Sequence, residues 1–311
     1  MTRNFAQIEP TSTCNLHCSF CIGREFTQGH LDPNHLVTLL SLFPTLSNIH
    51  LQGEGEPFLH PDWPTLIEIC RRKSRCISTT SNGTTLTDKN IELLIDSNLD
   101  LLKLSLETVN PDSFESIRGF SWTKWLYNLE LLVSRVKERQ SSLSIGFMVT
   151  LLKSTYLHVP AIKELYQELS LSGGMEFQWL NQSNFFTDFY RRTTPSLFLE
   201  IPTLSDSIAW MRIKSKLNLP VPRVKSFYQK IFSIPSATCP WLDTGIFMDR
   251  KGRLSPCCMI KPEQFSFGTV QSVTTEEINK EYQKLNYLFT HNIQESPCVG
   301  CSFAKAKLKI M

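Results

Sequence analysis

Residues 75–109, RCISTTSNGTTLTDKNIELLIDSNLDLLKLSLETV, contain a complete strand–helix–strand unit. The first segment reads as a strand that ends at the turn-forming pair Asn82-Gly83. Thr87 follows as the expected N-cap of a helix over 87–99, and a second apolar segment comes directly after that helix. This order and spacing are typical of a βαβ unit in a parallel sheet.

The same alternation continues on both sides of this unit. Strand segments are expected within 4–11, 48–57, 75–86, 100–109, 143–152 and 175–182, where the second and third each run into a Gly-containing turn. Helices are expected at 61–73, 87–99, 123–140 and 158–174. About six units are fewer than the eight of a complete barrel. The sequence therefore predicts an α/β fold, a partial (β/α)6 TIM-like barrel.

Composition limits the class of protein. The chain has 311 residues, is 41% hydrophobic and has a formal net charge of +3, which is ordinary for a globular protein and indicates no nucleic-acid partner. It has no uninterrupted apolar run of about 18 residues, as a membrane span requires. The N-terminus lacks the apolar core of a signal peptide. We therefore expect a cytoplasmic protein that binds neither nucleic acid nor membrane.

Three of the ten cysteines, Cys14, Cys18 and Cys21, form a C-x3-C-x2-C pattern. Disulfides are disfavoured in the cytosol, so metal or redox chemistry is the leading explanation. A structural zinc ion takes four ligands, whereas a cubane 4Fe–4S cluster takes one thiolate on each iron. Three thiolates would leave one iron open, at the carboxyl end of the first strand, where barrel active sites lie. A partial zinc site remains the alternative.

With Phe20 before its last cysteine, this pattern resembles the signature of the radical S-adenosylmethionine (radical SAM) superfamily. The resemblance implies that Cys14, Cys18 and Cys21 hold a 4Fe–4S cluster whose open iron binds SAM. It also implies reductive cleavage of SAM to a 5′-deoxyadenosyl radical that abstracts hydrogen from a substrate. Flavodoxin or ferredoxin would be the electron donor.

The segment GEGEPFLHP, which follows the second expected strand, resembles the GGEPL loop of that superfamily. The resemblance implies that Gly53, Gly55 and Glu56 lie against the methionyl amine of SAM. Glycine lets the backbone approach closely, and a carboxylate attracts an ammonium group. Glu54 stands where the family usually has glycine.

Two later segments complete the resemblance. TTSNGTTL resembles a strand end that the family places near the SAM ribose, which implies that role for Ser81 and Asn82. LKLSLETVNPDSFESIRGF resembles a motif that assigns Ser105 and Arg118 to the SAM carboxylate. Arginine suits this task because its fork binds a carboxylate in a bidentate manner. Glu107 stands where aspartate is usual.

A second group of cysteines lies beyond residue 238. Residues 244–258 read as a β-hairpin, and a helix over 274–292 precedes the final CVGC. Four thiolates could then converge on a cluster or a zinc ion: Cys239, Cys257 (or its neighbour Cys258), Cys298 and Cys301. The pattern, which includes Cys239-Pro240-Trp241 and Pro256-Cys257-Cys258, resembles the SPASM/twitch-like auxiliary domain. It implies one auxiliary 4Fe–4S cluster with Cys257 as the favoured ligand; a zinc knuckle is the alternative.

The predicted organisation is a radical SAM barrel over 1–180, an aromatic and basic connector over 181–238, and a SPASM-like domain over 239–311. The last would be a small Cys-rich iron–sulfur domain built of the β-hairpin and helix. The connector has eight Lys/Arg against three Asp/Glu. No catalytic acid or base is identified; Asp188, Tyr190 and Asp243 are equal candidates.

Three hypotheses for function follow. The first is a maturase that modifies a ribosomally made precursor peptide, because the basic, aromatic connector suits an extended or acidic chain. Only thirteen residues precede Cys14, so a separate small protein would recognise the leader peptide. The second is a dehydrogenase of a small sugar or alcohol. The third is a non-catalytic iron–sulfur or zinc scaffold. The connector could equally be barrel-closing core with a solvated basic face.

Overall fold

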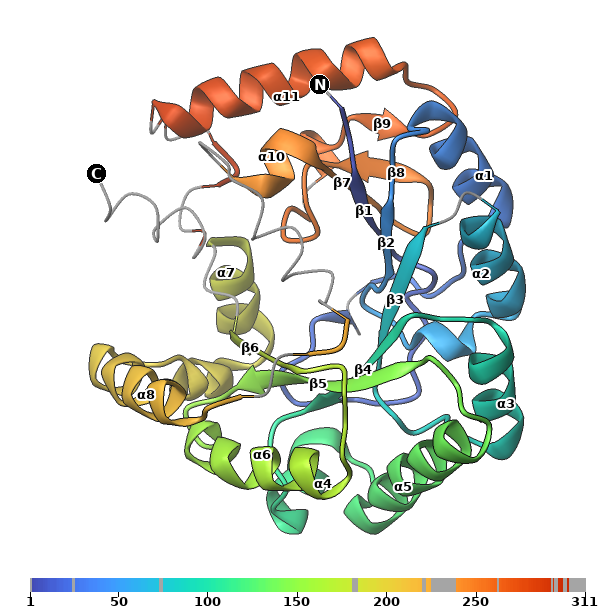
Figure 1. Cartoon of the computed structure of the whole chain (residues 1–311). Helices are drawn as coiled ribbons and strands as arrows, with labels where there is room; N and C mark the ends of the chain where they lie inside the picture. Colours follow the sequence, from blue (N-terminus) through green and yellow to red (C-terminus); the bar gives the residue numbers. More distant parts are fainter. Residues whose placement is uncertain are drawn as a thin grey trace.

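The computed structural model describes residues 2–23, 26–72, 75–180, 184–219, 222–224, 239–261, 263–291, 293, 296–298 and 301. Within these residues, one sheet has the strand order β6-β5-β4-β3-β2-β1-β7-β8-β9 (Figure 1). Its first six strands are β1 Phe5–Ile8, β2 Asn48–Leu51, β3 Cys76–Ser81, β4 Leu101–Leu106, β5 Ser144–Leu151 and β6 Met175–Trp179. Neighbours among them pair in parallel, which confirms the predicted partial six-unit barrel.

Helices cover the outer face of this sheet (Figure 1): α1 Pro33–Leu42, α2 Trp63–Arg71, α3 Asp88–Asp96, α4 Pro111–Arg118, α5 Trp122–Glu138 and α6 Val159–Glu168. Most of them bury an apolar stripe, which in α5 is Trp125, Leu129 and Leu132, whereas α4 buries Phe114 and Arg118. The side chain of Thr87 caps α3, as expected. Helices α1 and α4 were not among the predicted helices.

The C-terminal hairpin extends the barrel sheet. Strand β7 Gly245–Met248 pairs in parallel with β1, and β8 Arg253–Ser255 and β9 Gly268–Thr269 follow in antiparallel order. Helices α10 Pro240–Thr244 and α11 Thr275–Thr290 pack beside it (Figure 1). A Cβ atom on Gly245 would lie 2.4 Å from the Phe5 ring, so β7 needs a glycine to lie against β1. The predicted hairpin and helix are present; the domain boundaries remain a prediction.

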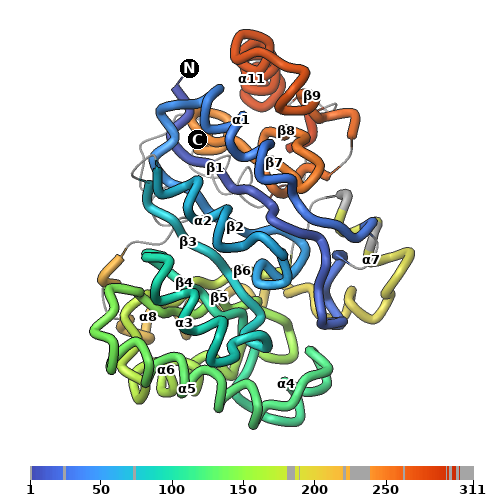
Figure 2. The backbone as a smooth tube through the Cα atoms, turned by 90° about the vertical axis from the view of Figure 1, so that its right-hand side faces the viewer, coloured from blue at the N-terminus to red at the C-terminus, as the bar shows by residue number. Residues whose placement is uncertain are grey.

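The described part of the predicted connector is largely helical. It comprises α7 Asn184–Thr193, a 3-10 helix Pro195–Glu200 and α8 Leu204–Lys216. Residues 181–183, 220–221 and 225–238 of that prediction lie outside the described residues. Figure 2 shows α7 beside the loop that follows β1. Phe186 and Tyr190 of α7 form an apolar cluster with Ile22 of that loop. None of the described helices is long and apolar enough to cross a bilayer.

Candidate functional site

The two ends of the loop that carries the first three cysteines are joined by hydrogen bonds; we call these joined ends the loop neck. The loop leaves β1 and returns to it, because the Ser12 amide donates to the Gly29 carbonyl at 3.0 Å and the Thr11 hydroxyl donates to the same carbonyl at 2.8 Å. The Ser12 hydroxyl also donates to the Thr27 carbonyl at 2.8 Å. The closed loop, which we call the cysteine loop (residues 11–30), therefore lies at the carboxyl end of β1.

The three thiols of the cysteine loop lie close enough to influence one another. Burial raises the pKa of Cys18 to about 11 and that of Cys21 to about 12, and the charge of Cys14 acts in the same direction on both. Burial also raises the pKa of Cys14. Iron–sulfur clusters are held by thiolates, so cluster binding here would release protons.

This donor set fits a cluster. In the described parts of the chain, no three His, Cys, Asp or Glu side chains converge tightly enough for a single metal ion. Ligands of one zinc ion all lie about 2.0–2.3 Å from it, whereas a cubane takes each thiolate on a different iron. Three free thiols on one loop are the donor type that such a cluster takes, so the residues present fit it.

The loop after β2 packs directly on the cysteine loop. The Gly55 amide donates to the Thr11 carbonyl at 3.1 Å, and the Glu56 amide donates to the Thr13 carbonyl at 2.9 Å. A Cβ atom on Gly55 would lie 2.5 Å from both carbonyl oxygens, and one on Gly53 would lie 2.1 Å from the Glu9 side chain. Gly55 is therefore required for contact between the two loops, and Gly53 leaves room for the Glu9 side chain. The predicted contact of both glycines with SAM remains a prediction.

Gly55→Ala is expected to push the two loops apart, because the neighbours of the new methyl group are backbone atoms that cannot rotate away. The expected loss in free energy of unfolding is about 1–3 kcal/mol, as for other overpacked sites. Denaturant unfolding of the metal-free protein measures it. An unchanged midpoint would contradict the packing described here.

Glu56 contacts two other predicted SAM-binding residues, Ser81 and Asn82. Its carboxylate accepts hydrogen bonds from the Ser81 hydroxyl at 2.8 Å, the Asn82 amide at 2.7 Å and the Phe58 amide at 3.3 Å. The residue is 1% exposed. Burial raises the pKa of Glu56 to about 7 from its usual 4.5, against the opposing effect of these donors. Glu56 thus ties the loop after β2 to the end of β3.

A carboxyl group whose pKa is higher in the folded state loses stabilising free energy as pH rises between its two pKa values. For Glu56 that window runs from 4.5 to about 7. The free energy of unfolding of the wild type, minus that of Glu56→Gln, should fall by about 3 kcal/mol across the window. Unfolding curves at several pH values measure this difference. A difference that stays flat, or rises with pH, would contradict a buried carboxyl that favours its neutral form.

Arg118 lies in a buried ion pair. Its Nε and Nη2 atoms donate to the two carboxylate oxygens of Glu107 at 2.7 and 2.8 Å, and both side chains are at most 2% exposed. Burial alone would lower the pKa of Arg118, but Glu107 and Cys18 raise it above its usual value. Ser105, the other residue assigned to the SAM carboxylate, is half-buried on β4. The sequence indicated both Glu107 and Arg118, but not that they pair.

The second group of cysteines also comes together. Burial raises the pKa of Cys298 to about 12, with Cys301 and Cys239 acting in the same direction. Burial likewise raises the pKa of Cys257, and Cys298 and Cys239 are among the groups that add to it. Lys261 and Glu54, in contrast, are the strongest charged neighbours of Cys258. Cys301 acts on Cys258 as well, so the choice of Cys257 over Cys258 stays a prediction.

A cavity of about 220 Å³ is lined by Cys21 of the cysteine loop and by Cys258 of the C-terminal segment. The polar and aromatic side chains that line it include Gln7, Gln52, Thr150, Gln178, Trp179 and Tyr190. We call it the lumen cavity. Of the three acid–base candidates, Tyr190 lines it, whereas Asp188 pairs with Arg191 and Asp243 lies near Cys239.

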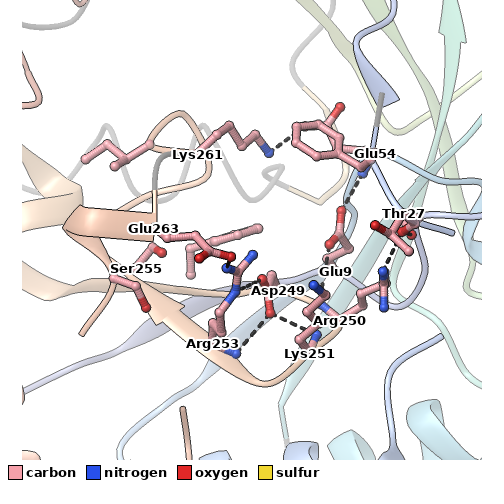
Figure 3. Close-up of a pocket in the computed structure, with 15 residues that line it drawn as sticks. Glu9, Thr27, Glu54, Asp249, Arg250, Lys251, Arg253, Ser255, Lys261 and Glu263 are labelled. Atoms are coloured by element: carbon pink, nitrogen blue, oxygen red, sulfur yellow. Dashed lines mark hydrogen bonds and ion pairs between the residues drawn. The ribbon is translucent and has the colours of Figure 1, made fainter. Parts of the chain in front are cut away.

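A second cavity of about 260 Å³ lies between the cysteine loop and the C-terminal hairpin (Figure 3). Charged side chains line most of it, among them Glu9, Asp249, Arg250 and Arg253. Glu54 and Lys261 line both cavities, so their ion pair forms a wall between the two spaces. We call the second space the hairpin cavity.

Comparison with known proteins agrees with this geometry. The family model of the radical SAM superfamily matches residues 8–165, and the chain belongs to that superfamily. It is 25% identical to a GTP 3′,8-cyclase of Microcystis aeruginosa, with 91% of this chain and 90% of that protein covered.

Solved structures share the fold at lower identity. The structure of Streptococcus suis SuiB bound to the precursor peptide SuiA matches with a TM-score of 0.71 and 14% identity, over 98% of this chain and 70% of that one. The structure of anSMEcpe with AdoMet and a Cp18Cys peptide matches with a TM-score of 0.65 and 18% identity, over 91% and 84% of the two chains.

Proposed function

We propose that this radical SAM protein is a peptide-modifying enzyme. Cys14, Cys18 and Cys21 would hold a 4Fe–4S cluster with one iron open to SAM. When bound, these groups supply a 5′-deoxyadenosyl radical that abstracts hydrogen from the substrate. The loops around Glu56 and Arg118 would hold SAM at the end of the barrel.

We further propose that Cys239, Cys257, Cys298 and Cys301 hold one auxiliary 4Fe–4S cluster in a SPASM-like C-terminal domain. The mutual influence of these thiols on their pKa values supports this ligand set. Cys21 and Cys258, the chain neighbour of Cys257, both line the lumen cavity, so a substrate bound there would lie near both proposed sites. Loaded protein should then contain about eight irons per chain, against about four with a single cluster.

The lining of the lumen cavity is the observation that carries the peptide assignment. Gln7, Gln52 and Gln178 contribute side-chain amides, and Thr150 adds a hydroxyl. Within this set the Gln7 Nε2 atom donates to the Gln52 backbone carbonyl, and the Gln52 Oε1 atom bonds to the His50 ring. These groups complement the N–H and C=O groups of a peptide, while Trp179 and Tyr190 offer apolar surface for its side chains. SuiB and anSMEcpe, which share the fold, were both solved with bound peptides.

The same lining disfavours a nucleoside triphosphate, the kind of substrate named for the cyclase relative. Among the described residues that line the lumen cavity, Lys261 is the one cation, and it is paired with Glu54 at 2.5 Å. A dehydrogenase of a small sugar or alcohol remains the second candidate, because amides and hydroxyls also bind hydroxyl groups.

Co-expression with a short precursor peptide encoded beside the gene, followed by mass spectrometry of the peptide, tests the proposal. We expect a defined mass change that requires Cys18. An unmodified peptide, together with turnover of a sugar or alcohol, would overturn the peptide assignment. Flavodoxin or ferredoxin is the proposed electron donor, and a separate small protein is the proposed leader-recognition partner.

A further inference from the structure

The turn between β7 and β8 is held in one conformation. Asp249 accepts hydrogen bonds from the amides of Lys251 and Arg253 at 2.8 and 2.9 Å, and from the Arg253 side chain at 2.7 Å. Gly252 adopts a φ of +75°, which favours glycine. This turn projects the Arg250 side chain toward the cysteine loop (Figure 3).

Arg250 contacts the neck of the cysteine loop. Its guanidinium donates to the Thr27 carbonyl, the same oxygen that accepts from the Ser12 hydroxyl. A Cβ atom on Gly29 would lie 2.7 Å from the Arg250 Nη1 atom, so the guanidinium occupies the space that a side chain at 29 would need. The Arg250 amide also donates to the Glu9 carboxylate at 3.3 Å.

The Glu9 carboxylate continues the network to the loop after β2. Its other oxygen accepts from the Glu54 amide at 2.8 Å, and Glu9 is 6% exposed. The Glu54 side chain then pairs with Lys261, which follows the hairpin. The Lys261 ammonium also lies 5.4 Å from the Phe247 ring centroid and 5.9 Å from that of Phe26, a cation–π geometry.

Glu54 lies beside the first cysteine site. Its carbonyl oxygen would be 2.6 Å from a Cβ atom on Gly23, and the Gly23 amide donates to the Cys21 sulfur at 3.3 Å. The reduction potential of an iron–sulfur cluster depends on net charge and hydrogen bonds around it. The Glu54–Lys261 pair is therefore close enough to affect a cluster bound through Cys21.

We propose that Arg250 and Lys261 of the C-terminal segment are positioning residues for the first cysteine site. Arg250 holds the neck of the cysteine loop, and Lys261 balances the charge of Glu54 beside Cys21. The inference rests on the proposed cluster at Cys14, Cys18 and Cys21, and it makes the C-terminal segment part of the SAM site.

Hydrogen exchange of the metal-free protein tests the role of Arg250 without any cluster. In Arg250→Met the amides of Ser12 and Leu31, which bond across the loop neck, should exchange at least about tenfold faster than in wild type. Arg250→Lys should restore part of the protection, since lysine can still donate to the Thr27 carbonyl. Lys251→Met, on the same turn, is the matched control and should exchange like wild type. Equal exchange in Arg250→Met and Lys251→Met would overturn this role.

The role of Lys261 is tested by two substitutions that should shift the reduction potential of the cluster in opposite directions. Lys261→Met leaves Glu54 unpaired and should lower the midpoint potential of the SAM-responsive cluster, while Glu54→Gln should raise it. The double variant should return toward wild type. Shifts in one direction, or none, would contradict the charge-balancing role. If wild-type protein gave no SAM-responsive signal, the proposed function would fail, and the exchange experiment would still decide the role of Arg250.

Discussion

Cys18→Ala is expected to reduce the formation of 5′-deoxyadenosine from SAM by at least about 100-fold. Loss of an outer partner of a metal site already costs about 10–100-fold, and Cys18 is a proposed direct ligand. The loop itself should survive, because its neck is closed by Ser12, Thr27 and Gly29 rather than by thiols. Anaerobic reconstitution followed by chromatography of the products measures the effect.

Cys76→Ala is the matched control for this substitution. Cys76 is a half-buried cysteine at the start of β3 and belongs to neither predicted set. Its variant should retain wild-type iron content and wild-type turnover. Equal losses in the two variants would mean general instability, and full activity in Cys18→Ala would contradict the ligand assignment.

Glu107→Gln is expected to lower the free energy of unfolding by about 3–5 kcal/mol. The substitution leaves the Arg118 guanidinium buried without its carboxylate, and breaking a buried ion pair from one side has costs of that size. Both side chains are at most 2% exposed, so water cannot replace the lost partner. Denaturant unfolding of the metal-free protein measures the change.

The matched control is Glu68→Gln, because Glu68 pairs with Arg72 at 2.5 Å on the exposed face of α2. Their side chains are 64% and 69% exposed, and such surface pairs contribute about 0–1 kcal/mol. If Glu107→Gln cost no more than this control, Arg118 would not depend on Glu107. It would then be free to bind the SAM carboxylate, as the sequence motif implies.

Local patterns carried most of the prediction of the fold. The βαβ alternation specified β1 to β6, and the N-cap Thr87 specified the start of α3, because these signals act over a few residues. Helix α4 had a signal of the same kind, with Asn110 as N-cap before Pro111. The same residues also belong to the segment that resembles a SAM-binding motif, and that motif does not indicate where a helix begins.

Long-range contacts could not be predicted in the same way. The parallel pairing of β7 with β1 joins residues at opposite ends of the sequence, such as Phe5 and Gly245. The contact of Arg250 with Thr27 is of the same type, and no short motif encodes it. Gly55 illustrates a different limit: the motif marked the position, but only the structure shows that its neighbours are the carbonyls of the cysteine loop.

The proposal that three cysteines hold a cluster with one open iron is tested most directly by paramagnetic resonance. The spectrum of the reduced, iron-loaded protein is recorded before and after addition of SAM. An iron bound by no cysteine at the end of β1 should accept the amino and carboxylate groups of SAM, so we predict a changed cluster signal that is absent from Cys18→Ala. An unchanged spectrum, in protein whose iron content shows that the site is filled, would mean that SAM does not bind an open iron at this site.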